Sequence, residues 1–295
     1  MSSVSETMAK RTTLEYMADH YGCELVPPFA ANVTVTSLAD DIDSITPGAL
    51  YIPRDGIDAN RMEQAVRRGA YAVLVPPSLR SLANTGELPV LVADLTDEQL
   101  GVLASDLCGK PANSLAVFAL AGGDPAAVGR NVRPLAQLLH TLGNPVSMIG
   151  SFGSRSLERR LQLNYPIGIL EVQRTLSICQ EDGAAAVVIA LDDTTLAAGS
   201  LNGVAVDVLG VDAMDSDPRN ADIGRRARET YGFVSDKQTH VTGRTGESDQ
   251  IAIQSSANGD LEEIKRLSLA IAMVMEAGVR KNNIKNALRV SHDLG

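Results

Sequence analysis

Residues 115–143 read LAVFALAGGDPAAVGRNVRPLAQLLHTLG, and this stretch decides the fold class. It opens with an apolar run at residues 115–120 that has the length of a buried strand. The sequence Gly122-Gly123-Asp124-Pro125 follows and is typical of a loop. A helical pattern then runs to Gly143, a residue that readily ends a helix. We therefore predict a strand, a loop and a helix in the order that lets backbone N–H groups surround a phosphate.

The predicted loop, residues 121–131, lacks the lysine that a phosphate loop requires. No lysine occurs anywhere between Lys110 and Lys237. The loop also places an acid where a phosphate would bind, followed by a proline that has no N–H to donate. The two glycines remain able to form an anion nest, and an arginine is available as a substitute cation. The residues of this degenerate phosphate loop are Gly122, Gly123, Asp124, Val128, Gly129 and Arg130.

Apolar runs alternate with helical patterns along the rest of the chain. The runs that predict strands are residues 33–38, 49–52, 70–75, 89–92, 184–191 and 204–211. The patterns that predict helices are residues 11–21, 60–68, 97–107, 170–180, 225–231, 261–277 and 283–290. Residues 215–220 and 238–249 are polar, and we predict loops there. The alternation predicts an α/β fold in which helices cover both faces of mostly parallel, doubly wound sheets.

A polar segment with a glycine and a proline, residues 109–113, separates two complete α/β patterns. Such a composition is typical of a boundary between domains. We therefore predict one domain over residues 1–108 and a second over residues 114–295.

The overall composition limits the classes of function. The chain has 295 residues, of which 44% are hydrophobic, and a net charge of −10. A negative balance argues against nucleic acid or an anionic membrane surface as the main partner. No apolar run approaches the roughly 18 residues that span a bilayer, and the first ten residues do not resemble a secretory signal. The three cysteines are far apart, so we expect reduced thiols in a cytoplasmic protein without membrane insertion.

Acidic and basic residues form three further candidate groups. Asp192 and Asp193 follow the predicted strand at 184–191, and paired carboxylates suit magnesium, although a solvated turn with a helix cap is the alternative. A second acidic group consists of Asp212, Asp215 and Asp217, for which the alternative is a solvated loop. The basic group consists of Arg155, Arg159 and Arg160, which suit an anionic ligand or partner unless they form a solvated helix face. We assign no metal site and no cofactor to these residues.

Several framework motifs resemble those of the Mur ligases of peptidoglycan synthesis, most closely the kind that adds the third residue to UDP-N-acetylmuramoyl-dipeptide. They occur in order and with the family's spacing at residues 35–38, 46–52, 63–75, 138–143, 149–153, 196–203 and 206–208. The resemblance implies a bacterial protein with a domain of the uridine nucleotide-binding type over residues 1–108. It implies a central domain of the phosphate-loop ATPase type over residues 114–295. We expect the family's third domain, which binds the incoming amino acid, to be absent.

The functional motifs of the Mur ligases are not kept at the matching positions. The Gly-Lys-Thr of the phosphate loop falls on residues 127–129, and the Thr-Thr-Pro that contacts the muramoyl peptide falls on Asn164-Tyr165-Pro166. The motif with the magnesium-binding glutamate falls on residues 190–194, and the later Arg-Asp-His falls near residues 216–218. The uridine-side Asp-Ser-Arg falls on Asp41-Ile42-Asp43, which keeps the first aspartate. The family's carbamylated lysine, which bridges the metal ions, has no counterpart, because no lysine occurs between Lys110 and Lys237.

These observations predict a catalytically inactive Mur ligase homologue with a binding or regulatory role in cell-wall synthesis. Its partner would be a muramoyl nucleotide or a cell-wall or division protein. We expect the ligand cleft between the two domains, facing residues 155–160 and the loop after Ala190. Its candidate residues are Arg155, Arg159, Arg160, Asn164, Tyr165, Asp192 and Asp193. On the uridine side, the candidate residues are Asp41 and Asp43 of one loop. One alternative is an ATP-dependent acid–amino-acid ligase with altered site residues. Another is a structural subunit that completes a composite site with a partner chain.

Overall fold

The computed structural model describes residues 12–54, 56–85, 88–236, 239–255 and 260–293. The chain forms two compact units, and the division falls between Lys110 and Pro111. This position lies inside the polar segment at residues 109–113. Gly109 and Lys110 both have positive φ, 76° and 56°, so the backbone turns sharply directly after the last helix of the first unit.

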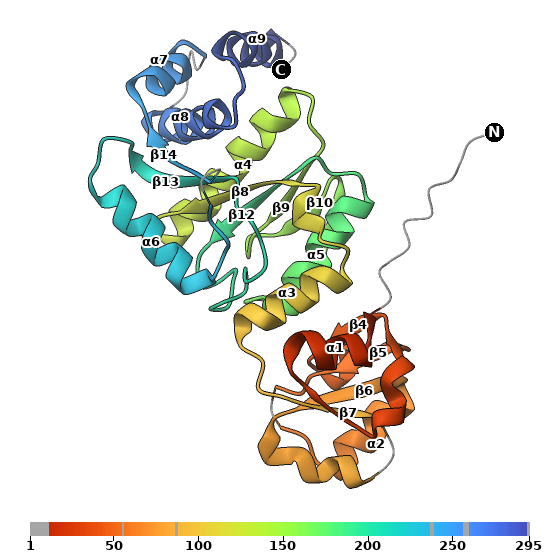
Figure 1. Ribbon diagram of the computed structural model, residues 1–295. Helices are drawn as coiled ribbons and strands as arrows, with labels where there is room; N and C mark the ends of the chain where they lie inside the picture. The colour runs from red at the N-terminus through yellow and green to blue at the C-terminus, as the bar shows by residue number, and fades with distance from the viewer. Residues whose placement is uncertain (1–11, 55, 86–87, 237–238, 256–259, 294–295) are drawn as a thin grey trace, which may run out of the picture. The chain divides into compact units, whose positions relative to one another are not determined.

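The first unit contains a five-stranded sheet in the order β2-β7-β6-β5-β4 (Figure 1). Strands β4 to β7 are parallel, and the edge strand β2 is antiparallel to β7. The strands are β2 (Glu24–Val26), β4 (Ser37–Ala39), β5 (Ala49–Tyr51), β6 (Ala70–Val75) and β7 (Val90–Val92), with a separate antiparallel pair of β1 (Thr12–Thr13) and β3 (Thr34–Val35). The helices are α1 (Leu14–Tyr21), α2 (Ala59–Arg68) and α3 (Asp97–Leu107), with 3₁₀ turns at Pro28–Asn32, Ile42–Ser44 and Pro77–Thr85.

Local sequence signals fix the ends of the helices in this unit. The Asp58 side chain accepts a hydrogen bond of 2.8 Å from the Arg61 N–H and caps the start of α2. Gly69, with φ of 92°, ends α2 and leads directly into β6. Thr96 and Gln99 cap each other's backbone N–H at the start of α3. These caps place the helices against a core that is centred on β5, β6 and β7.

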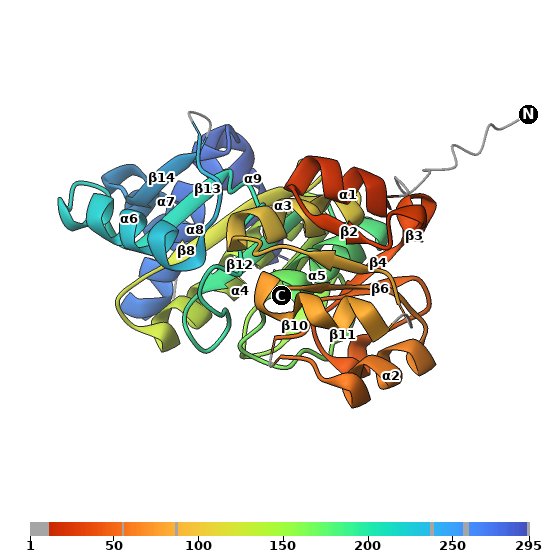
Figure 2. The ribbon, with the colours of Figure 1, turned by 60° about the horizontal axis from the view of Figure 1, so that its bottom comes forward.

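The second unit contains a seven-stranded sheet in the order β11-β10-β9-β12-β8-β13-β14 (Figure 2). Its five strands β9, β12, β8, β13 and β14 are parallel, and β10 is antiparallel to both of its neighbours. The strands are β8 (Ala116–Ala121), β9 (Val146–Ile149), β10 (Ser154–Ser156), β11 (Arg159–Leu161), β12 (Ala186–Leu191), β13 (Val208–Met214) and β14 (His240–Arg244). The helices are α4 (Pro125–Thr141), α5 (Ile169–Glu181), α6 (Arg219–Tyr231), α7 (Gly246–Ser255), α8 (Leu261–Glu276) and α9 (Lys281–Asp293), with a 3₁₀ turn at Pro111–Asn113.

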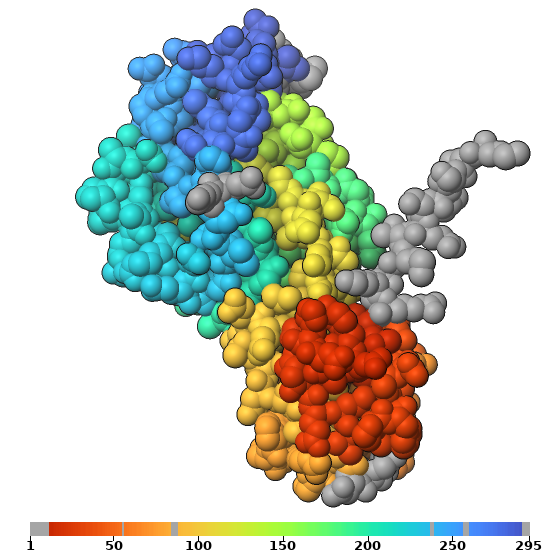
Figure 3. Space-filling model, viewed as in Figure 1, coloured from red at the N-terminus to blue at the C-terminus, as the bar shows by residue number. Residues whose placement is uncertain are grey.

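Two apolar clusters cover the two faces of this sheet. Along β8, Val117 and Ala119 belong to the cluster with α5 and α6, whereas Phe118 and Leu120 belong to the cluster with α4 and α8. The alternation follows from the two-residue period of a strand, and burial on both faces is typical of a parallel sheet. The C-terminal helices lie beside α4, dark blue against yellow-green in Figure 3. The predicted α/β fold with mostly parallel sheets is thus confirmed.

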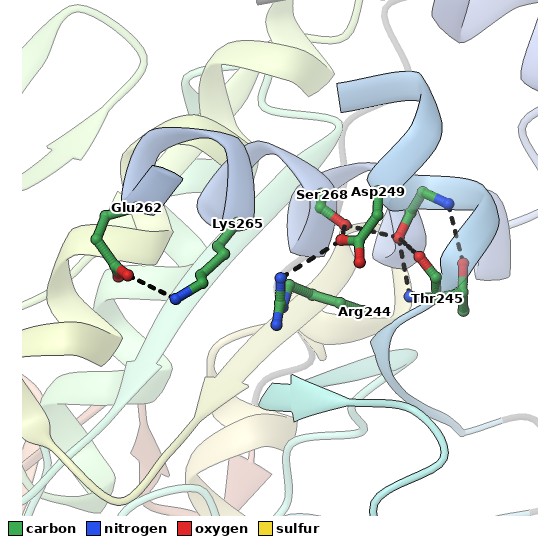
Figure 4. Close-up of polar contacts among 7 residues, drawn as sticks. Arg244, Thr245, Asp249, Glu262, Lys265 and Ser268 are labelled. Carbon is green, nitrogen blue, oxygen red and sulfur yellow. Dashed lines mark hydrogen bonds and ion pairs between the residues drawn. The ribbon is translucent and has the colours of Figure 1, made fainter. Parts of the chain in front are cut away.

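A buried polar contact joins α7 to α8 (Figure 4). The hydroxyls of Ser248 and Ser268, both fully buried, are 2.8 Å apart, and Ser268 also donates to the Asp249 carboxylate. Arg244, at the end of β14, lies 3.4 Å from the same carboxylate. Thr245 and Ser248 exchange hydrogen bonds that start α7. This network fixes the position of α8, whose first turns contribute to the candidate site.

Four local predictions are wrong. Residues 240–244 and 246–255 form β14 and α7 where we predicted a loop over 238–249, of which residue 238 lies outside the described part. Helix α4 starts at Pro125 and not after residue 131, and α6 starts at Arg219 within the predicted loop 215–220. The predicted strand 204–211 is β13 at Val208–Met214, because Val204 and Val206 bond to the backbone of Val234 instead. Caps and long-range pairing override local composition at each of these places.

Among the described residues, no helix is both long enough and apolar enough to cross a membrane.

Candidate functional site

A cavity of about 930 Å³ opens in the second unit beyond the carboxyl ends of β8, β9 and β12. This is the edge at which α/β sheets bind their ligands. The start of α4, the loop after β9, the loop after β12 and the start of α8 surround it. The lining residues are Asp124, Pro125, Ala126, Gly129, Arg130, Arg133, Pro134, Ser151, Phe152, Asp192, Thr194, Glu263 and Arg266.

The first turn of α4, which forms one wall, has its own N–H donors occupied. Asp124 is the N-cap, and its carboxylate accepts from the Ala126 N–H at 3.0 Å. The Asp124 carbonyl accepts from the N–H groups of Ala127 and Val128, each at 3.0 Å. Pro125 has no N–H. The helix end that commonly binds a phosphate therefore presents a carboxylate in place of N–H donors.

The other predicted phosphate-loop residues lie in different surroundings. Val128 is 1% exposed and belongs to the core between α4 and the sheet. A Cβ at Gly129 would lie 3.1 Å from the Phe152 ring, so this glycine admits the ring against the helix. Arg130 is exposed and lies 3.5 Å from the Asp124 carboxylate. A Cβ at Gly122 would lie 3.1 Å from Val128, whereas Gly123 faces open space.

The aspartate pair after β12 separates into a structural residue and an exposed one. Asp192 is 5% exposed, and its carboxylate accepts from the N–H groups of Thr194 and Thr195 at 3.0 and 2.8 Å and from both hydroxyls. Thr195 in turn accepts from the Ser151 N–H at 2.9 Å and holds the loop after β9. Asp193 is exposed. Burial, and after it the charges of the two aspartates, raise the pKa of nearby Tyr231 to about 12.

The second acidic group is also used locally. Asp215 accepts from the Gly243 N–H at 3.1 Å and ties β13 to β14. Hydrogen bonds from Arg219 lower the pKa of Asp217 to about 2. Asp212 is exposed at the end of β13. In the part of the chain that the structure describes, no three histidine, cysteine or acidic residues are grouped as metal ligands would be.

Arg155 and Arg160 line a second cavity, of about 520 Å³, next to the first. They lie on a β-hairpin, so the alternative of a helix face is wrong. Arg159 lies on the other face of the same hairpin and forms an ion pair with Asp182 at 2.6 Å. Hydrogen bonds from Ser156 and then Arg159 lower the pKa of Asp182.

The remaining predicted residues are divided between the two units. Tyr165 lines the 520 Å³ cavity; its hydroxyl is hydrogen-bonded to Ser154 at 2.5 Å, and burial raises its pKa. Asn164 is exposed beside it and is not among the lining residues of either cavity. In the first unit, Asp41 accepts from the Asp43 N–H at 3.3 Å, and Asp43 forms an ion pair with Arg68 at 2.5 Å.

Sequence reasoning missed several residues of these cavities, four of which bear on their charge and shape. Arg133 and Phe152 line both cavities, and the guanidinium lies 5.8 Å from the centre of the ring. Glu263 and Arg266 come from the start of α8, more than 100 residues along the chain. Arg133 lies three residues after Arg130 on the same helix, and that spacing is a usable signal. No local pattern indicates that α8 reaches this edge of the sheet.

Comparison with known proteins finds relatives among the Mur ligases. No family model matches the chain. The chain is 26% identical over 192 residues to UDP-N-acetylmuramoyl-L-alanyl-D-glutamate–2,6-diaminopimelate ligase of Xylella fastidiosa, which covers 63% of this chain and 38% of that protein. It is 31% identical over 114 residues to the ligase of the same name from Streptomyces coelicolor, covering 38% and 22%.

Solved structures share the fold at lower identity. A structure of a UDP-N-acetylmuramoyl-L-alanyl-D-glutamate–2,6-diaminopimelate ligase superposes with a TM-score of 0.58 at 10% identity, covering 94% of this chain and 66% of that one. MurF from Acinetobacter baumannii superposes with a TM-score of 0.57 at 14% identity, covering 95% and 68%. The sequence matches span between about a fifth and two fifths of the curated relatives' length. The chain is thus similar in sequence to ligases of the Mur family and shares their α/β fold.

Proposed function

We propose that the chain is a non-catalytic Mur ligase homologue with a binding role in peptidoglycan synthesis. Its partner is either an anionic ligand of the muramoyl nucleotide class or another protein. The start of α4 carries the proposal. Its first-turn N–H donors bond to Asp124 or are absent at Pro125, so the helix presents the Asp124 carboxylate at its N-terminus. A triphosphate brought to this helix would meet a like charge.

The chemistry of ligation supports the same conclusion. A ligase that activates a carboxylate with ATP must stabilise the charge that develops on the transferred phosphoryl group. Lysine, magnesium and backbone N–H groups usually supply that stabilisation. The cavity residues do not fit this role, because Asp192 is bonded to its own turn and Val128 is in the core. We derive no step through ATP or magnesium at this site.

Calorimetry can test the proposal if it separates a nucleotide site from general attraction to anions. The protein is titrated with magnesium-ATP and, in parallel, with magnesium-tripolyphosphate at the same ionic strength. We expect ATP to bind no more tightly than tripolyphosphate. A site without free N–H donors for the phosphates cannot position the nucleoside. A micromolar dissociation constant for ATP, at least tenfold tighter than for tripolyphosphate, would contradict the proposal.

Binding of the physiological class of ligand is the positive arm of the same test. UDP-N-acetylmuramoyl-L-alanyl-D-glutamate, the substrate in the relatives' printed names, is titrated without ATP. Saturable binding together with no release of phosphate from ATP supports a binding role. Absence of binding would leave the protein-partner form of the proposal, which is tested by purifying the chain with its partners under native conditions.

An ATP-dependent ligase with altered site residues is the second candidate. One observation favours it, since Arg130, Arg133 and Arg266 line the 930 Å³ cavity and could replace a lysine. Arg130 is already opposed by Asp124. Phosphate release from ATP that depends on both the muramoyl dipeptide and diaminopimelate would establish this candidate instead.

A further inference from the structure

The cavity of about 520 Å³ is lined by three arginines, Arg133, Arg155 and Arg160. All other lining residues are uncharged, so no carboxylate is among them. In a chain with a net charge of −10, a concentration of positive charge of this kind is unusual.

The architecture explains how the three side chains meet. Arg155 on β10 is directly opposite Arg160 on β11 and is also paired with Met148 on β9. These residues therefore share one face of the sheet. Met148 packs against the apolar cluster of α4, which identifies that face as the one covered by the helix that carries Arg133. A helix and a hairpin thus direct three cations to one cavity.

The grouping is unfavourable without a ligand. Like charges placed directly opposite on neighbouring strands destabilise a sheet, and Arg155 and Arg160 are such a pair. Within the described ranges, none of the three arginines forms an ion pair with a carboxylate, whereas Arg159 on the opposite face is paired with Asp182. An anion in the cavity would relieve the repulsion.

We propose that this cavity binds a small ligand through a diphosphate group. A planar guanidinium presents two parallel N–H donors that match phosphate oxygens, and three of them suit a group with two or three negative charges. The Phe152 ring, which with Met148 packs on the α4 side of the sheet, provides an apolar surface for the rest of the ligand. The proposal rests on the proposed binding function and names the chemistry of the ligand.

The test uses neighbouring arginines as matched variants. Arg160→Gln removes a cation from the cavity, and Arg159→Gln removes the same charge one residue away on the other face. The full chain and both variants are titrated with inorganic pyrophosphate by calorimetry, in buffer without magnesium, and with citrate as a carboxylate of similar charge. Arg133→Gln repeats the test from the helix side, and far-UV circular dichroism verifies that each variant is folded.

We expect pyrophosphate to bind the unaltered protein and Arg159→Gln equally. Arg160→Gln and Arg133→Gln should each bind it at least about tenfold more weakly, as expected for a lost charge-assisted hydrogen bond. Citrate should bind at least tenfold more weakly than pyrophosphate. Three results would overturn the inference: no binding of pyrophosphate, equal losses in Arg159→Gln and Arg160→Gln, or equal binding of citrate.

The result is independent of the nucleotide test. A preference for ATP over tripolyphosphate that Arg160→Gln leaves unchanged would refute the proposed non-catalytic function and leave the diphosphate cavity standing. Failure of pyrophosphate to distinguish Arg159→Gln from Arg160→Gln would refute the cavity and leave the non-catalytic function standing.

Discussion

Asp192 and Asp193 are adjacent carboxylates at the end of one strand, and at the scale of single residues their surroundings differ sharply. Asp192 accepts hydrogen bonds from the next two residues through both backbone and side-chain donors. Asp193 points to solvent. The sequence shows two equivalent acids, and only the path of the chain after them decides which one is buried. A rule based on residue type alone cannot separate a metal ligand from a turn residue here.

This difference predicts different costs of removal. Asp192→Ala should lower the free energy of unfolding by about 1–3 kcal/mol, because it leaves the donors of buried Thr195 without their acceptor. Asp193→Ala should change it by less than about 0.5 kcal/mol, as exposed substitutions usually do. Urea unfolding of both variants measures the two values. Equal costs would show that the Asp192 network does not stabilise the fold.

At the scale of elements, the start of α4 was predictable in principle. Asp124 followed by Pro125 is a strong N-cap and first-turn signal. The resemblance of the same residues to a phosphate loop predicts a loop to residue 131 instead. The β10–β11 hairpin was not predictable, since strands of three residues rich in serine and arginine carry no apolar alternation. Because the hairpin places Arg155 and Arg160 in the same cavity as Arg133, that grouping could not be predicted from the sequence either.

The contact between α7 and α8 gives a test at this scale. Ser248→Ala and Ser268→Ala should each cost about 1–2 kcal/mol of stability, because each leaves the other buried hydroxyl with fewer partners. Because the hydroxyls bond to each other, the double variant should cost less than the sum of the two single variants. Chemical denaturation of the three variants measures the coupling.

The exposed pair Glu262–Lys265 is the matched control (Figure 4). It lies on the same helix, and Lys265→Ala should change stability by about 0.5 kcal/mol or less, as is usual for surface ion pairs. Additive costs for the two serine variants would contradict a direct contact between α7 and α8 through these side chains.

At the scale of the whole molecule, the alternation of strands and helices was enough to predict the α/β class. Buried strands such as β8 and β12 carry continuous apolar runs that only a doubly covered sheet explains. Strand order was not predictable, because it depends on which crossovers pack together over the sheet. The placement of α8 beside α4 depends on the same packing, and it supplies part of the candidate site.

Each unit has an apolar cluster of its own, so each should fold by itself. We expect fragments 1–110 and 111–295, expressed separately, to unfold cooperatively on heating. Differential scanning calorimetry and far-UV circular dichroism of each fragment, compared with the intact chain, check this. A fragment without a cooperative transition would show that its fold requires the rest of the chain.

The burial of Val128 also limits what a single substitution can achieve. A lysine at this position would enter a core site that is 1% exposed. Burying an ammonium there costs several kcal/mol or forces it to lose its proton. Val128→Lys should therefore lower the urea midpoint without creating affinity for ATP. A lysine could reach the 930 Å³ cavity only if the first turns of α4 unwound, so this single substitution destabilises the helix without creating a nucleotide site.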